Sequence, residues 1–208
     1  MPIMRGSASF SRFRVDEAKA SKAALKDPAR ALRLRAFVPL ERGGEAERAQ
    51  GFVELEQKDQ AEFSPGSIYQ GPYALFAYRV DEVRLPAAAV RAELELWEQK
   101  FRDEQGRPPG RKEKADAKGE IRHTLRARYP LATKVFEISW NLDAGALQIW
   151  AGSRKAVDEV QAALEQALGF KLVPAVPATL AAELGIPEKA LAPTPALSGA
   201  EEGAHGQA

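Results

Sequence analysis

The sequence predicts an α+β protein, in which mixed or antiparallel sheets pack against helices and a basic helical hairpin protrudes. Strand-like segments come first, two strong helical segments follow, and a β-hairpin with a further helix ends the ordered part of the chain. This order lacks the regular strand–helix alternation that builds a parallel doubly wound sheet. With 208 residues, of which 45% are hydrophobic and 28% charged, the chain has the composition of a globular protein with a sizeable core.

The N-terminal segment predicts a strand followed by two helices. Residues 6–15 mix polar and apolar side chains in the manner of a half-buried strand. Residues 16–26 are compatible with a helix. A second helix is expected from Pro28, because Asp27 suits the N-cap and a proline at the first helical position gives up no hydrogen bond.

A loop, two strands and a turn region are expected before the centre of the chain. Residues 41–50 are charged and contain two adjacent glycines, which predicts a loop, and residues 51–55 follow as a short strand. Proline and glycine pairs mark residues 64–72 as turns. Residues 73–85 combine apolar and aromatic side chains, as a long half-buried strand does.

A helical hairpin is expected over residues 85–130. Its first helix covers residues 87–102, which are strong helix formers, and begins with Pro86 at the first helical position. Glycines and prolines over residues 106–110 break the chain, and residues 111–128 form the second helix, which a proline ends. The apolar stripe of the first helix consists of Val90, Leu94, Trp97 and Phe101.

The next elements are a β-hairpin and a helix. Residues 133–141 and 146–151 are expected to be the two strands of the β-hairpin. Residues 154–168 have a clear helical apolar stripe, with Ser153 as the expected N-cap and Gly169 as the residue that ends the helix.

The chain is expected to end in a low-complexity tail. A strand over residues 170–176 and a short helix over residues 178–184 come before it. Residues 188–208 are rich in Ala, Gly and Pro, which predicts disorder. We therefore expect one α+β region over residues 1–187 and a disordered tail after it.

The composition excludes several chemistries. The chain has no cysteine, which excludes disulfides, thiolate metal sites and a cysteine nucleophile. Its two histidines, His123 and His205, are too few for a multi-histidine metal centre. Neither a signal peptide, a membrane-spanning run nor a P-loop is found. We expect a cytoplasmic protein with no membrane partner, and we assign no cofactor, metal ligand or catalytic residue.

Charge is segregated along the chain. The net charge of +1 is made of +6 over residues 1–40, −6 over 41–104, +6 over 105–134 and −5 over 135–208. The two basic blocks together suit a polyanionic partner. The alternative is that the acidic blocks fold back and neutralise them.

The strongest candidate site lies on the predicted helix 111–128. At about 100° per residue, its basic side chains fall on one flank of an apolar stripe formed by Ala117, Ile121 and Leu125, and its acidic side chains fall on the other flank. Four cations form an uninterrupted i, i+4 row, which is self-repelling unless a polyanion lies beside it. The row consists of Lys114, Lys118, Arg122 and Arg126, and the candidate DNA-binding residues that extend it are Arg107, Arg111, Arg128 and Lys134.

Other functional interpretations have less support. His123 falls away from the apolar stripe and is expected to face solvent. The acidic pairs could serve a metal-dependent nuclease, but adjacent side chains point apart, so surface charge explains them more simply. Aromatic residues could stack single-stranded bases or belong to the core. The acidic pairs are Asp16-Glu17, Asp81-Glu82 and Asp103-Glu104, and the aromatic residues are Trp97, Phe101, Trp140 and Trp150.

Several short motifs, in order and spacing, resemble the recombination-associated protein RdgC family. The clearest similarity covers about 90 residues, over residues 84–170, and Gly51-Phe52-Val53 resembles a further family segment. The chain would be a short member that lacks the C-terminal part of longer relatives. The motifs that carry the resemblance are Arg84-Leu85-Pro86, residues 110–114, residues 120–125, Arg128, residues 141–145, residues 151–159 and Leu168-Gly169.

The resemblance implies a bacterial nucleoid-associated protein that binds double-stranded DNA without sequence preference. It implies a homodimer whose basic hole encircles the duplex, and a function that restrains RecA-dependent recombination. The family also carries an exonuclease label. Two alternatives therefore stay open beside a non-catalytic DNA-binding protein: a metal-dependent exonuclease, and a protein-interaction module that acts on a recombinase through the acidic residues 41–104.

Overall fold

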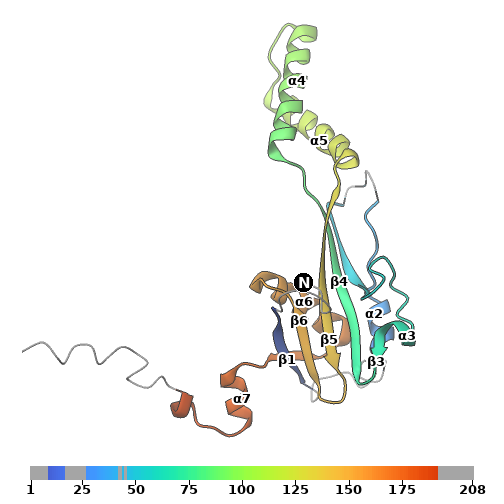
Figure 1. Cartoon of the computed structure of the whole chain (residues 1–208). Coiled ribbons are helices and arrows are strands. Elements are labelled where there is room, and N and C mark those ends of the chain that lie inside the picture. Colours follow the sequence, from blue (N-terminus) through green and yellow to red (C-terminus); the bar gives the residue numbers. More distant parts are fainter. Residues whose placement is uncertain (1–8, 17–26, 42–43, 45, 192–208) are drawn as a thin grey trace, which may run out of the picture.

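A computed structural model describes residues 9–16, 27–41, 44 and 46–191 of the chain (Figure 1). Its centre is one seven-stranded sheet in the order β2-β4-β5-β6-β1-β7, with β3 paired to β4 outside this path. Neighbouring strands are antiparallel throughout. The strands are β1 (Ser11–Asp16), β2 (Arg48–Glu54), β3 (Tyr69–Gln70), β4 (Tyr73–Val83), β5 (Leu131–Asn141), β6 (Ala146–Trp150) and β7 (Lys171–Pro174).

Helices pack on the sheet and extend beyond it, which confirms the α+β class. Among the expected caps, Asp27 accepts a hydrogen bond from the Arg30 N–H at 3.1 Å, Ser153 accepts one from the Ala156 N–H, and Gly169 ends its helix with φ of 67°. The helices are α2 (Pro28–Arg33), α3 (Pro65–Ile68), α4 (Ala87–Gln105), α5 (Arg111–Arg128), α6 (Arg154–Leu168), α7 (Pro177–Glu183) and the 3₁₀ helix η2 (Glu188–Leu191).

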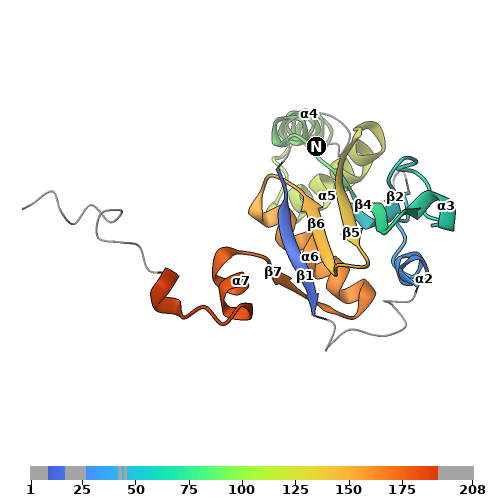
Figure 2. The same ribbon diagram turned by 60° about the horizontal axis from the view of Figure 1, so that its bottom comes forward.

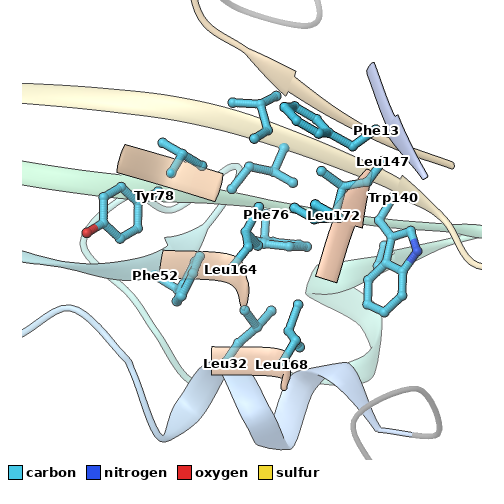
Figure 3. Packing of buried hydrophobic residues seen from close by; sticks show 14 of the residues in the cluster. Phe13, Leu32, Phe52, Phe76, Tyr78, Trp140, Leu147, Leu164, Leu168 and Leu172 are labelled. Atoms are coloured by element: carbon cyan, nitrogen blue, oxygen red, sulfur yellow. The ribbon is translucent and has the colours of Figure 1, made fainter. Parts of the chain in front are cut away.

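The hydrophobic core lies between one face of the sheet and the helices α2 and α6 (Figures 2 and 3). The strands supply it by alternation, as β4 does with Phe76 and Tyr78, and α6 supplies it with a stripe at helical spacing. The four buried residues of that stripe are Val157, Val160, Leu164 and Leu168, as the sequence predicts.

The opposite face of the sheet carries charged side chains that neutralise one another. The carboxylate of Asp81 is 1% exposed and accepts two hydrogen bonds from the Arg79 guanidinium, at 3.0 and 2.8 Å. The same guanidinium lies 4.6 Å from the ring centre of Phe37. A buried carboxylate needs such a bidentate partner to offset its desolvation. The buried charge on this face is therefore neutralised by a cation of the same face.

The helical hairpin is the connection between two neighbouring strands. β4 and β5 pair along their whole eleven-residue length, from Tyr73 opposite Asn141 to Val83 opposite Leu131. The chain leaves β4 and returns to β5 at the same end of this ribbon, so α4 and α5 lie side by side and project from the sheet (Figure 1). The projecting hairpin is thus built on the longest strand pair of the sheet.

Several boundaries differ from the sequence expectation because strand pairing sets them. Residues 41–50 were expected to be a loop, but β2 already begins at Arg48, which pairs with Glu82 of β4. The expected turns over residues 64–72 contain the short helix α3 and strand β3, and β3 closes a tight hairpin against β4. Neither element is long enough to give a periodic signal in the sequence.

Other corrections concern the ends of elements. Pro86 is the N-cap of α4 and not its first helical residue, because its ψ of 128° is extended. α4 continues to Gln105, where Gly106 with φ of 64° ends it. The first four residues of the expected tail form η2, and the rest of the tail lies outside the described residues. Of the expected helix over residues 16–26, Asp16 is the last residue of β1, and residues 17–26 lie outside the described residues. No helix of the described part is long and apolar enough to cross a membrane.

The backbone of Phe37 lies so close to β2 that only glycine fits at position 51. A Cβ at this position would lie 2.5 Å from the backbone N and Cα of Phe37. We expect Gly51→Ala to lower the free energy of unfolding by about 1–3 kcal/mol, because backbone atoms must shift to admit the methyl group. Gly119→Ala is the control: the position has open space in α5, so the free energy of unfolding should rise by about 0.5–1 kcal/mol. Urea denaturation of both variants measures this, and equal stabilities would contradict it.

Candidate nucleic-acid interface

The hairpin is a thin layer of two helices. On α5, Ala117 and Leu125 are 5% and 6% exposed, and Ile121 between them is half-buried, which confirms the predicted apolar stripe. α4 contacts α5 through a half-buried stripe and has no fully buried residue. That stripe consists of Val90, Leu94, Trp97 and Phe101. In the part of the chain that the structure describes, no third layer covers the pair, so most charged side chains of both helices lie at the surface.

The two helices carry opposite net charge. α5 has seven Lys or Arg and three Asp or Glu, a net charge of +4. α4 has three Lys or Arg and five Asp or Glu, a net charge of −2. The predicted hairpin is therefore present, but its basic character belongs to one helix.

At the tip of the hairpin, Arg107 is held by Glu113. The guanidinium donates two hydrogen bonds to the Glu113 carboxylate, at 3.0 and 2.7 Å, and lies 5.2 Å from the ring centre of Phe101. The same carboxylate accepts a hydrogen bond from the Gly110 N–H at 2.6 Å, which caps the start of α5. Arg107 and, to a lesser degree, Gly110 lower the pKa of Glu113 to about 2.

In the first turn of α5, next to the tip of the hairpin, Lys114 joins the two helices. Its Nζ lies 2.8 Å from Oε1 of Glu98 on α4. Lys114 is the first residue of the cationic row, so this row begins with a cation that already has a carboxylate partner. The pair also pins α5 against α4.

At the base of the hairpin, one carboxylate pairs with two cations of the row. Glu47, just before β2, accepts hydrogen bonds from Arg126 and from Arg122, the latter at 3.1 Å. The hydrogen bond from Arg126, followed by that from Arg122, lowers the pKa of Glu47. The backbone oxygen of Glu47 accepts from the Val83 N–H at the end of β4. Glu47 therefore fixes the end of α5 to the end of the sheet.

The remaining candidate residues are available to a partner. Lys118, Arg111 and Arg128 are exposed and form no ion pair within the part of the chain that the structure describes. Lys134 is exposed on β5, and its charge contributes to the lowered pKa of Glu82, for which the hydrogen bond from Arg84 is the main cause. The row is thus continuous along α5, and Lys118 stands at its centre without an ion pair among the described residues.

Sequence reasoning identified the cations of this surface but missed their carboxylate partners. Glu47 and Glu98 belong to the acidic block 41–104, so the alternative that acidic residues fold back onto basic ones is correct for part of the row. The sequence indicated these partners only through the acidic block 41–104. The block does not tell which acidic residue contacts which cation, because residues such as Glu47 and Arg122 are 75 positions apart.

The other candidate groups do not form a common site. Trp140 is a core residue, 1% exposed, beside Phe170. Trp150 packs against Phe10, and Trp97 packs against Phe101 on α4. In the ranges that the structure covers, no three His, Asp or Glu side chains are grouped so that they could hold a metal ion.

Ion pairs that are partly or fully exposed to solvent contribute little to stability, and every ion pair of the hairpin described above is of this kind. A phosphate oxygen can take the place of a carboxylate oxygen at an arginine or lysine at little cost, since both are anionic acceptors with similar geometry. The face of α5 is therefore suited to a polyanion even though carboxylates occupy part of it. We call the row and its extensions, Arg107, Arg111, Arg128 and Lys134, the α5 cationic face.

Comparison with known proteins gives one family match. The family described as "RdgC: Putative exonuclease, RdgC" matches residues 10–186 of the chain. No curated protein matches the sequence.

The pairing at the hairpin tip predicts a pH effect. Because the folded hairpin lowers the pKa of Glu113, the contact stabilises the fold above the ordinary pKa of 4.5 and loses its effect as the pH falls towards 2. We expect Arg107→Ala to move the pKa of Glu113 up towards 4.5, and high salt to do the same in part. The carboxyl ¹³C shift of Glu113 against pH measures both, and identical midpoints in the two proteins would rule out the contact.

Proposed function

The chain belongs to the RdgC family, and from this premise we propose that it binds double-stranded DNA through the α5 cationic face. The cations would contact phosphates, which position the protein on the duplex but carry no base information. Binding is therefore insensitive to sequence and steeply dependent on salt.

One observation carries this proposal: a continuous row of four cations lies on a helix that projects away from the body of the protein (Figure 1). A projecting helix can approach a rod-like duplex without a clash between the duplex and the sheet. The carboxylates that now pair with Lys114, Arg122 and Arg126 keep these side chains ordered and can be exchanged for phosphates. Each phosphate that is neutralised releases counterions, which favours the exchange.

We further propose that the protein is a homodimer and that it is cytoplasmic and associated with the nucleoid. It would restrain RecA-dependent recombination by occupying the duplex. The family is linked to recombination, which supports this role. A duplex that is covered by protein is withheld from the recombinase, so no direct contact with RecA is needed. The solution mass with and without a short duplex tests the dimer and its DNA complex together.

Removal of three row residues should weaken binding to every duplex alike. We expect Lys118→Ala, Arg122→Ala and Arg126→Ala together to reduce the slope of log affinity against log salt by up to about 3, since each lost phosphate contact removes about 0.9. Fluorescence anisotropy with a labelled 20-base-pair duplex measures this at several salt concentrations. The matched control replaces Lys58, Lys155 and Lys171 of the sheet body with Ala and should leave the slope unchanged. If the two triple variants bind alike, the α5 cationic face is not the DNA site.

Removal of the carboxylate at the base of the hairpin should have the opposite effect. Glu47→Gln frees Arg122 and Arg126 for phosphates, so we expect affinity for the same duplex to rise by about threefold to tenfold. Asp158→Asn is the control, because it removes an equal charge from a carboxylate that pairs with Arg154 on α6, away from the hairpin. Weaker binding by Glu47→Gln would show that Glu47 positions the arginines and does not compete with phosphate.

The description of the family supports a second candidate, an exonuclease. We propose that the chain binds DNA and does not cut it. An end-labelled duplex incubated for hours with the purified protein and Mg²⁺ or Mn²⁺ should stay intact. A metal-dependent nuclease activity that yields a ladder of products and co-purifies with the folded protein would establish the exonuclease instead.

A further inference from the structure

A cavity of about 760 Å³ lies at the root of the hairpin. It is formed where the chain leaves β4, where α4 begins and where the middle of α5 passes. Its volume is in the range of pockets that hold small ligands or a few side chains of a partner. The side chains that give it its character are Val83, Leu85, Val90, Leu94, Arg91 and Lys118.

One wall of this cavity is apolar and partly exposed among the described residues. Val83, Leu85, Val90 and Leu94 are all half-buried, although they face a concave surface. Burial of such side chains is favourable, so the wall is suited to apolar groups of a partner.

The rim of the cavity carries an excess of positive charge. Arg84 and Arg122 also line it, but each has a carboxylate partner there, Glu82 at 3.0 Å and Glu47 at 3.1 Å. Arg91 from α4 and Lys118 from α5 are exposed, and neither forms an ion pair with any described residue. Beside the apolar wall, two cations from two helices therefore have no ion-pair partner among the described residues.

We propose that this cavity docks an acidic peptide segment that carries large apolar side chains. The apolar side chains would lie on the wall of Val83, Leu85, Val90 and Leu94, and neighbouring carboxylates would pair with Arg91 and Lys118. A peptide of this kind matches both halves of the cavity at once. A duplex would pair only with the cations, because its phosphates are charged and its bases are stacked inside. The apolar wall would then remain exposed to water.

The inference goes beyond DNA binding and stands without it, because Arg91 and Leu94 are not part of the α5 cationic face. Lys118 and Arg122 belong to both surfaces. Peptide and duplex would therefore compete for these two side chains, and a bound peptide would weaken DNA binding.

Fluorescence anisotropy with a labelled hexapeptide, Glu-Asp-Leu-Glu-Leu-Phe, tests the proposal on the full chain. Two further peptides serve as controls: one with Leu and Phe replaced by Ser, and one with Glu and Asp replaced by Gln and Asn. We expect the first peptide to bind at least about tenfold more tightly than either control, because a buried leucine contributes about this factor and the three carboxylates contribute it together.

Matched variants of α4 locate the site. Leu94→Asn should weaken binding of the hexapeptide about tenfold, whereas Leu96→Asn should not, because Leu96 is 63% exposed and lies outside the cavity. Arg91→Ala should weaken peptide binding and leave duplex binding unchanged, whereas Arg102→Ala, outside the cavity on the same helix, should change neither. Arg91→Ala and its control Arg102→Ala keep the test valid if Leu94→Asn destabilises the hairpin.

Three results would overturn the proposal. In the first, the hexapeptide does not bind at millimolar concentration. In the second, it binds no better than the acidic control peptide, and the cavity is then only part of a cationic surface. In the third, Leu94→Asn and Arg91→Ala weaken the duplex and not the peptide, and the cavity then belongs to the DNA interface.

Discussion

The pairing of β4 with β5 is the constraint on which the rest of the structure depends. Eleven residues of each strand are hydrogen-bonded in one continuous antiparallel ladder. The ladder crosses the core and continues to Val83 and Leu131, where the chain departs into α4 and returns from α5. The two helices therefore begin and end next to each other and must project from the end of the ribbon (Figure 1). A short connection would have given an ordinary β-hairpin, and the 47-residue insertion between the strands gives a helical arm instead.

The electrostatics of this arm follow from its thinness. With only one helix to pack against, α5 buries a narrow apolar stripe and leaves its cations on the surface. Repulsion along an i, i+4 row of cations destabilises an isolated helix. Glu98 on α4 and Glu47 before β2 relieve this repulsion at both ends of the row. The same carboxylates hold the helix against its neighbours and pair with three of the four cations of the row. Pre-ordering of this kind would reduce the entropy that is lost on the proposed binding of DNA.

The root of the hairpin joins two different kinds of surface. On α5, cations form a strip along the helix axis. Between α4, α5 and the exit of β4, a cavity combines an apolar wall with two cations, Arg91 and Lys118, that have no ion-pair partner among the described residues. Lys118 and Arg122 are common to the strip and the cavity. The proposed nucleic-acid surface and the proposed peptide surface thus share two residues, which is a physical basis for coupling between them.

Local features of this chain were determined by the sequence alone. The α6 stripe, its Ser153 cap and Gly169 end, and the apolar stripe of α5 depend only on residues within a few turns, so periodicity and capping chemistry predict them. The tertiary structure decided the start of β2, because backbone pairing with β4 extends that strand into charged residues. It also decided which acids meet the cationic row. Glu47 reaches Arg122 and Arg126 only because the β4 ladder brings the residue before β2 to the base of the hairpin. Side chains 75 positions apart leave no periodic signal in a sequence, and the Coulomb attraction between them acts only once the backbone has placed them in contact.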